Sequence, residues 1–500
     1  MAKTNSLLPA VICAFIITIL FHRQSTGLNL LLAEMLIFGW MAYQKFLNLK
    51  NRNHLIFGLG VLMTAIAVVV TNSYLVIFTN LLAVFILSGV LVYPETKSIF
   101  NAILTSLYNL YCAQATFFNK FSQSGSGSKS SRRIRKAGIF IVPLVIIGFF
   151  IWIYRSSNPF FDRLALSVSN FIGTQLDFIF GRFDLAVIFT FLLALLISNF
   201  LFFGIPFDEI AKADQRANDE LHRDRKKMPR KFRLLALSNE QKAGIFLLLM
   251  LNAALLVMNS IDFYYVWFNF TWNGQYLKQF VHEGTYLLLL SIICSIAIVL
   301  YFFRGNLNFY SRNKILRYLS YAWLIQNAIL TLSVGMRNFW YIRYFALAYK
   351  RIALIIFLAL TLYGLYTVFI KVRDRKSSFY LFRRNGLAIY ILLVLGSLIN
   401  WDNVIAKYNF SHADKSFVDL EYNSRLSDKA LPHLDKSPEE LKIIAQQQQA
   451  NFHFEMEYME PAEFHRIITV RKKEFLSRWE SQSWLSWNLP EHMAYEKLKE

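Results

Sequence analysis

The sequence predicts an all-α protein, a polytopic transmembrane helix bundle of about 11 spans with a small helical C-terminal tail outside the membrane. Of its 500 residues, 55% are hydrophobic, which is typical of membrane proteins. Three uncharged runs, at 284–303, 318–336 and 352–370, are each close to the roughly 20 residues that cross a bilayer core of about 30 Å. These runs show no strand-like alternation, and lipid offers no partner to an exposed backbone amide, so helices are expected.

Residues 1–94 are expected to form an N-terminal group of four transmembrane helices. Leu7–Phe21 and Leu28–Tyr43 are the first two, and the first is read as uncleaved because Phe21-His22-Arg23 replaces a small-residue cleavage site. Residues 55–94 contain no charged residue, and their length is about twice one span. The polar residues Thr71-Asn72-Ser73 divide this stretch into two helices.

Residues 95–136 are predicted to separate that group from the rest of the chain. The aromatic, weakly polar stretch Thr96–Phe121 predicts a helix on the membrane surface. The following SQSGSGSKSSRRIRK predicts a flexible linker with a basic end. Residues 137–401 are then expected to be a seven-helix transmembrane core. Its spans are the three opening runs together with 137–154, 185–203, 243–261 and 386–401.

The distribution of Lys and Arg predicts the orientation. If the N-terminus is cytoplasmic, the inner segments carry more than three times as many Lys and Arg residues as the outer loops. An odd number of spans then places residues 402–500 outside. The formal net charge of +21 is therefore a topology signal, and no nucleic-acid partner is expected. Membrane lipids are the expected partners, with anionic lipid contacting the basic cytoplasmic loops.

The extracytoplasmic tail, residues 402–500, is expected to be a small helical appendage. Ser437-Pro438-Glu439-Glu440 predicts a helix start, because Ser can cap, Pro fits the first turn and Glu440 completes a capping box. A second helix is predicted to start near Pro461. The few aliphatic residues of this region do not favour a catalytic domain.

The inner loop at 204–242 mixes both charge signs at helical spacing. It is read either as a solvated helix followed by a basic cluster attracted to anionic lipid, or as a docking site for a cytoplasmic protein.

Glu34 lies six residues inside its predicted span, roughly 9 Å below the outer boundary. A charge near the bilayer centre costs about 2.5–3.5 kcal/mol, so this carboxyl should be protonated, paired or facing water. It is either a proton or cation site, or a neutral group that hydrogen-bonds between helices. The candidate partners for the second reading are Asn80, Asn252, Gln326 and Asn327.

The predicted outer face gathers charged residues at span ends, interleaved with aromatic residues. Rings can cover an apolar body while Arg holds a carboxylate or phosphate, although any interfacial belt has the same composition. The candidate substrate or ion site comprises Glu34, Glu283, His282, Arg337, Arg343 and Asp184.

No catalytic, cofactor or metal site is predicted. His282-Glu283-Gly284 begins like a zinc-protease motif, but Tyr286 stands where the second His ligand is required. The chain has no GxxxxGK[ST] phosphate loop and no GxSxG nucleophile elbow. Its three cysteines suggest neither a disulfide framework nor a structural zinc site.

Five segments in the second half of the chain carry a recognisable pattern: FTWNGQYLKQFVHEGTY at 270–286, WLIQNAIL at 323–330, YIRYFALAYKRI at 341–352, NWDNVIAKYN at 400–409 and LEYNSRLSDKALPHL at 420–434. Together they resemble one uncharacterised family of bacterial multi-pass membrane proteins, catalogued as domain of unknown function number four-one-seven-three. The resemblance implies a bacterial cytoplasmic-membrane protein with no established activity, so no catalytic residue is carried over.

These observations favour a non-enzymatic membrane protein, either a carrier of a small or lipidic anionic substrate or a membrane component of an envelope assembly. Two alternatives stay open. One is a membrane-embedded transferase that uses a lipid-linked donor at the outer face, with Asp162, Asp184 or Glu283 as the base. The other is a membrane sensor or scaffold that docks a cytoplasmic partner through the 204–242 loop.

Overall fold

The computed structural model describes residues 7–124, 185–223, 233–270, 274–452 and 459–499, and parts of 143–168. The described residues are helical and contain no β-strand beyond one isolated bridge between Glu220 and Lys376. Seven helices in this part of the chain are long and apolar enough to cross a membrane, and three shorter apolar helices accompany them. The predicted fold class is confirmed. The predicted span at 137–154 lies largely outside the described residues.

The chain divides into two compact units. Unit 1 comprises Met1–Asp214 together with Ser483–Asn488, a segment that we call the C-terminal strap. Unit 2 comprises Gln215–Gln482 and Leu489–Glu500. The chain therefore passes from one unit to the other three times.

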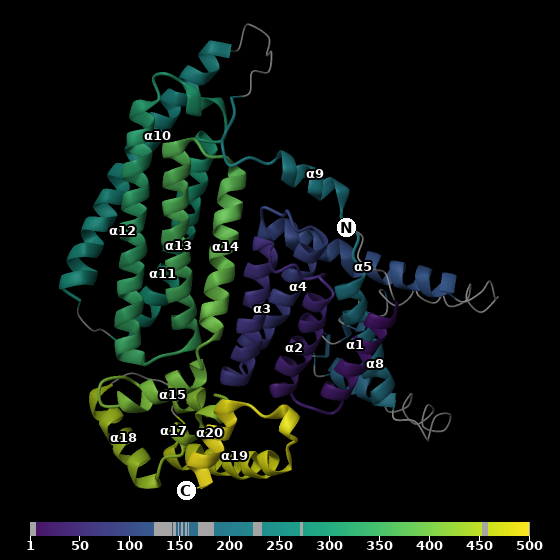
Figure 1. Cartoon of the computed structure of the whole chain (residues 1–500). Helices are drawn as coiled ribbons and strands as arrows, with labels where there is room; N and C mark the ends of the chain where they lie inside the picture. Colours follow the sequence, from purple (N-terminus) through teal and green to yellow (C-terminus); the bar gives the residue numbers. More distant parts are fainter. Residues whose placement is uncertain are drawn as a thin grey trace. The chain divides into compact units, whose positions relative to one another are not determined.

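Figure 1 shows the helices of unit 1, and local sequence signals set the bounds of two of them, α3 (Arg52–Thr71) and α4 (Tyr74–Val92). The side chain of Asn51 caps the start of α3, and the side chain of Ser73 caps α4. Asn72, with φ 43°, ends α3 in the left-handed conformation that Asn tolerates, so the predicted division at 71–73 is confirmed. The helices are α1 (Leu7–Phe21), α2 (Leu28–Tyr43), α3 (Arg52–Thr71), α4 (Tyr74–Val92), α5 (Ile99–Ser124), α8 (Leu185–Phe202) and α9 (Asp208–Arg216).

Helix α5 contacts its neighbours through its polar side. Thr105, Ser106 and Asn109 are buried, and the Ser106 hydroxyl donates to the Phe85 carbonyl of α4 at 2.6 Å. The two helices pack closely at Gly89, where an added Cβ would lie 2.1 Å from the Ala102 carbonyl oxygen. The apolar side of α5 faces outward. This polarity suits a helix with lipid beside it, because buried polar groups must bond within the protein.

The C-terminal strap packs against the loop between α1 and α2. The Leu28 amide donates to the Trp487 carbonyl at 2.9 Å, and the Ser486 hydroxyl donates to the Gln24 side chain at 3.0 Å. Gly27 allows this approach, since an added Cβ would lie 2.4 Å from the Ser486 carbonyl oxygen.

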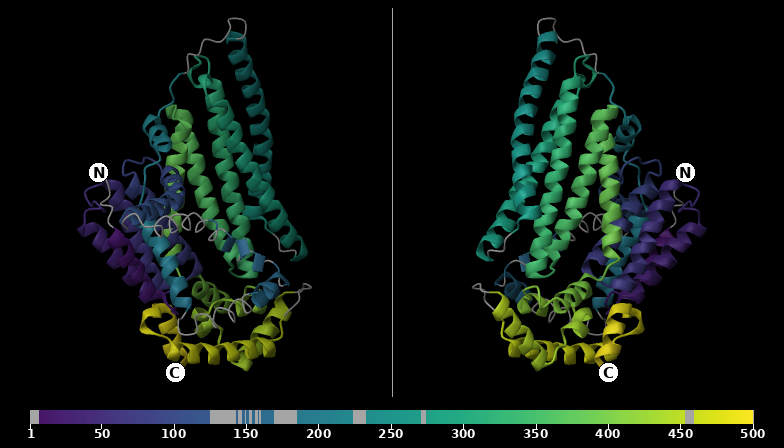
Figure 2. Two further views of the ribbon diagram at one scale, coloured as in Figure 1. Left: turned by 90° about the vertical axis from the view of Figure 1, so that its right-hand side faces the viewer. Right: turned by 90° about the vertical axis from the view of Figure 1, so that its left-hand side faces the viewer.

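The long helices of unit 2 lie side by side, with α12 packed against α10, α11 and α13, and α14 packed against α13 (Figures 1 and 2). Their shared core is apolar and includes Leu248, Ile292, Leu316 and Val368. The helices are α10 (Arg233–Asp262), which continues as the π-helix η2 (Phe263–Phe268), α11 (Gly274–Phe302), the short η3 (Asn306–Phe309), α12 (Lys314–Phe345), α13 (Tyr349–Asp374) and α14 (Ser378–Ser397).

The rest of unit 2, residues 401–482 and 489–499, forms a small helical region that we call the tail domain. Leu431, Phe464 and Phe475 are fully buried in its core, which extends to Ile352 on α13. The capping box at Ser437 and the helix starting at Pro461 are both confirmed. The elements are α15 (Trp401–Ser411), α16 (Leu420–Ser424), η4 (Asp428–Ala430), α17 (Leu431–Leu434), α18 (Pro438–Asn451), α19 (Pro461–Ser481) and α20 (Leu489–Lys499). Between α19 and α20 lies the short η5 (Trp484–Ser486) of the strap.

Candidate functional site

The junction of α10, η2 and α12 contains a buried ion pair. Arg337 of α12 donates through its guanidinium to the Asp262 carboxylate at the end of α10, and their side chains are 3% and 2% exposed. The sequence makes Arg337 a candidate for a substrate or ion site on the predicted outer face. The structure instead places it inside the helix bundle, where its charge is matched by the acid.

The π-helical turn η2 determines where the side chains that follow Asp262 lie. The Asn269 amide donates to the Tyr264 carbonyl at 3.0 Å, five residues back, as a π-turn requires. The Val266 carbonyl accepts from the Trp340 indole at 2.9 Å, and the Trp267 indole donates to the Ser333 hydroxyl at 3.1 Å. Both tryptophans therefore hold η2 against α12. Such turns occur frequently at functional sites.

Arg343, the second candidate arginine, is exposed on α12. Its guanidinium lies over the Trp340 ring, 5.4 Å from the centroid, and Trp340 stacks on Phe270 with centroids 4.8 Å apart. Within the described ranges Arg343 has no acidic partner. Its positive charge is thus available to a ligand beside an aromatic surface.

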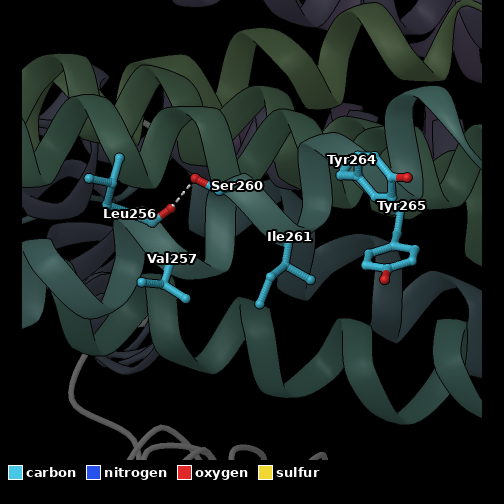
Figure 3. Close-up of a pocket in the computed structure, with 6 residues that line it drawn as sticks. All are labelled: Leu256, Val257, Ser260, Ile261, Tyr264 and Tyr265. Carbon is cyan, nitrogen blue, oxygen red and sulfur yellow. Dashed lines mark hydrogen bonds between the residues drawn. The ribbon is translucent and has the colours of Figure 1, made fainter.

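A shallow, open groove of about 410 Å³ lies on the surface of α10 and η2. Leu256, Ser260 and Tyr264 project along one side and Val257, Ile261 and Tyr265 along the other, as Figure 3 shows. The groove is thus the space between two rows of side chains spaced four residues apart. Its lining is almost entirely apolar.

The turn between α12 and α13 is fixed by the tail domain. Asn409 holds Leu347 from both sides: its side-chain oxygen accepts from the Leu347 amide at 2.7 Å, and its side-chain nitrogen donates to the Leu347 carbonyl at 3.1 Å. The Ser416 hydroxyl donates to the Arg343 carbonyl at 2.8 Å. We call these contacts, together with the bond from the Phe417 amide to the Tyr344 carbonyl at 2.7 Å, the turn clasp.

A second layer of polar contacts lies beside the turn clasp. The Tyr349 hydroxyl donates to Asp402 at 2.8 Å, and the Ser427 hydroxyl donates to the other oxygen of the same carboxylate at 2.6 Å. The Tyr422 hydroxyl accepts from the Tyr349 amide at 3.0 Å, and burial raises the pKa of Tyr422. Tyr349, Tyr422 and Asp402 thus stabilise the α12–α13 turn through their hydrogen bonds.

Glu34 lies in unit 1, on α2, within hydrogen-bond reach of the Asn80 side chain of α4. The Asn80 amide also donates to the Thr64 hydroxyl of α3 at 3.2 Å, which links three helices. One carboxyl oxygen of Glu34 is buried and has no hydrogen-bond partner among the described residues. Of the four partners considered from the sequence, Asn80 is the one beside Glu34, whereas Asn252 and Gln326 bond each other at 2.7 Å in unit 2.

The structure does not describe the side chains of the three remaining candidate site residues. His282 and Glu283 lie on α11, but their side chains are outside the described residues, as is Asp184. Among the residues that are described, no group of three or more His, Cys, Asp or Glu side chains could hold a metal ion.

The arrangement therefore has two parts. In unit 2, an apolar groove, an aromatic surface and Arg343 lie around η2, and the turn clasp lies beyond them on α12. In unit 1, the Glu34 carboxyl of α2 lies beside Asn80 of α4. Sequence reasoning missed the pairing of Asp262 with Arg337 and the role of Asn409. The only available signal for the first was an acid and a base at predicted span ends.

Comparison with known proteins identifies the family. A family described as "Domain of unknown function (DUF4153)" matches residues 58–437, well over half of the chain. No curated protein and no solved structure matches. The family number expected from the sequence, DUF4173, is therefore wrong. Short aromatic and charged segments between apolar runs occur in many multi-pass membrane proteins. They therefore distinguish one family from another less well than a match over 380 residues, from 58 to 437, does. This integral membrane protein belongs to the DUF4153 family.

Proposed function

We propose that this protein is a membrane component of an envelope assembly, located in the bacterial cytoplasmic membrane. Its tail domain would be the extracytoplasmic platform that a partner protein contacts. The turn clasp carries this proposal. Asn409 and Ser416 bond to backbone atoms of the α12–α13 turn, so the platform is fixed to a transmembrane hairpin rather than tethered by a flexible linker.

Arg337 and Arg351, unlike the exposed Arg343, use their charges inside the protein, and this favours an assembly role over a carrier role. Arg337 is matched by Asp262 inside the bundle. Arg351 donates to the carbonyls of Phe345 and Ala346, so its charge is used at the turn. A carrier of an anion needs such charges free to bind substrate.

Contacts inside each unit agree with the assignment of the contacting segments to a common side of the membrane. In unit 1 the strap bonds the α1–α2 loop, and Asn72 of the α3–α4 turn donates to Thr26 of that loop at 3.0 Å. In unit 2 the tail domain bonds the α12–α13 turn. The positive-inside assignment puts all of these segments outside.

Native electrophoresis of the protein tagged at its chromosomal locus tests the assembly role. The wild-type protein should migrate in a discrete complex that contains a second kind of chain, identified by mass spectrometry after a second purification. Asn409→Ala, which loosens the platform, should shift the protein out of that complex. A wild-type protein that migrates alone or only with copies of itself would exclude the assembly role.

A carrier remains the second candidate, because one carboxyl oxygen of Glu34 lies among apolar helices and, in the part of the chain that the structure describes, has no hydrogen-bond partner. Proteoliposomes with an internal pH dye and an imposed potassium gradient test it. A carrier that uses Glu34 to move protons should acidify the lumen, and Glu34→Gln should abolish this. Equal rates for the wild type and Glu34→Gln exclude that version.

A further inference from the structure

We infer that the α12–α13 turn is a strained latch. The tail domain holds Ala346 in a backbone conformation that a residue with a Cβ atom resists, so release of the tail domain lets the turn relax and loosens the end of α12. This inference deepens the assembly role and rests on it, because a partner that binds the tail domain would release the turn. Three observations lead to it: the conformation of Ala346, the bonds on either side of it, and the contacts of α12 one turn earlier.

Ala346 has a backbone conformation that is usual only for glycine. It follows the last residue of α12 with φ 62° and ψ −168°. In this region the Cβ atom of an L-residue crowds the backbone, so the conformation costs free energy and persists only where surrounding contacts enforce it. Ala346 is buried, so such contacts surround it. The turn therefore stores strain.

The transmembrane hairpin itself supplies part of these contacts. Arg351 of α13 donates through its guanidinium to the carbonyls of Phe345 and Ala346. The guanidinium also lies over the Tyr341 ring, 4.5 Å from its centroid, and the Asn338 side chain donates to the Arg351 carbonyl at 3.1 Å. All of these groups belong to α12, α13 or the turn between them, so they stay together when the tail domain moves.

The tail domain supplies the rest through the turn clasp, whose bonds lie on both sides of Ala346. Before it, the Tyr344 carbonyl accepts from the Phe417 amide at 2.7 Å. After it, the Leu347 amide and carbonyl bond the Asn409 side chain at 2.7 and 3.1 Å. The clasp therefore fixes the residues on either side, and Ala346 must take the conformation that joins them.

Relaxation of the turn would reach η2 through α12. Tyr344 lies about one helical turn after Trp340, whose indole donates to the Val266 carbonyl of η2 at 2.9 Å. The Trp340 and Tyr344 rings are also stacked, with centroids 6.4 Å apart. A change at the end of α12 thus acts on the contact that holds η2. The buried pair of Arg337 and Asp262, about two turns before Tyr344, keeps the helices themselves together.

Hydrogen–deuterium exchange of the full-length protein in lipid nanodiscs, read by mass spectrometry, measures how often the clasp opens. Ala346→Gly removes the Cβ atom that opposes the closed turn and keeps every bond of the clasp. The amides of Leu347 and Phe417, which both donate within the clasp, should exchange about tenfold more slowly in this variant.

Ala348→Gly is the matched control for the strain. Ala348 is extended, with φ −149°, so glycine relieves no strain there and should leave the exchange of the clasp amides equal or faster. Slower exchange in Ala346→Gly but not in Ala348→Gly supports the latch. The latch is excluded if Ala346→Gly exchanges as fast as the wild type.

A second variant tests whether the latch reaches η2. Asn409→Ala opens the clasp, and exchange should become about tenfold faster at Phe417 and also at Asn269, whose amide closes the η2 turn at 3.0 Å. Asn403→Ala, on the same helix as Asn409, should exchange like the wild type at both amides. Faster exchange at Phe417 alone would overturn the coupling to η2.

These measurements use the protein without a partner, which keeps two possible failures apart. A protein that migrates alone in native electrophoresis would exclude the assembly role without altering any of these exchange rates. Unchanged exchange in Ala346→Gly would exclude the latch even if the protein migrates in a complex with a second kind of chain.

Discussion

Arg337 of α12 and Asp262 at the end of α10 form an ion pair that is almost completely removed from solvent, although they are 75 residues apart in the chain. Each charge is tolerated in the interior only because the other is present. The pair therefore fixes the contact between two long helices, and this contact positions η2.

Removing one member of this pair should destabilise unit 2. Arg337→Met leaves the carboxylate of Asp262 buried without its counter-charge, at an expected cost of about 3–5 kcal/mol. The measurement is thermal stability in detergent, followed by fluorescence-detected size exclusion. The double variant Asp262→Leu with Arg337→Met removes both charges and should regain most of the loss. A double variant as unstable as the single one would contradict this account.

Asn409→Ala should loosen the tail domain. The substitution removes both hydrogen bonds to Leu347 and leaves two backbone groups without partners, which costs about 1–3 kcal/mol for each buried group. Limited proteolysis of the tail domain in proteoliposomes should become at least about tenfold faster. Asn403→Ala on the same helix is the control, and the prediction is wrong if the two variants are cleaved at the same rate.

Gly27→Ala should detach the C-terminal strap, because the new Cβ would meet the Ser486 carbonyl carbon and oxygen, which are backbone atoms and cannot rotate away. A cysteine placed at Trp484 in a variant free of native cysteines reports the change through its labelling rate with a membrane-impermeant maleimide. Gly39→Ala is the matched control, since its Cβ would meet no atom within 4 Å. Equal labelling in the two variants would argue against the contact.

The tail domain should lose stability as the pH falls from 7.5 to 5.5. Burial lowers the pKa of His433, and the nearby Lys497, Lys407 and Lys436 lower it further. The unfolded chain therefore takes up a proton near its ordinary pKa of about 6.5, whereas the folded domain resists it. Stability is present above about pH 6.5 and declines below it.

His433→Gln tests this pH dependence because it removes the titrating group. Thermal melts of the tail domain in the full-length protein, recorded at both pH values, should show a smaller difference for the variant than for the wild type. An unchanged difference would assign the effect to other groups.

Local signals in the sequence were sufficient for most helices. The ranges Leu7–Phe21 and Leu28–Tyr43 are those observed for α1 and α2, and Asn72 ends α3 as expected. These predictions succeed because apolar runs, caps and breaks act within a few residues. The predicted span at 243–261 was too short, since α10 begins at Arg233, where charged residues extend the helix beyond the apolar run.

The contacts that define the candidate site could not be predicted in the same way. Asn409 meets Leu347 across 62 residues, and Ser486 meets Gln24 across 462. No local sequence pattern indicates that Asn409 bonds the backbone of a distant turn, or that Gly27 packs against a carbonyl far away in the chain. The groove also depends on which face of α10 its neighbours leave uncovered, which hydropathy along the sequence does not reveal.

The contact between Ser486 and Gln24 has a consequence for biosynthesis. Ribosomes add about 5–20 residues per second, so roughly 20–90 seconds separate the emergence of these two residues. The loop between α1 and α2 therefore waits without this contact until the strap has been synthesised. A nascent chain truncated before Ser483 will leave the loop between α1 and α2 without the strap that packs against it.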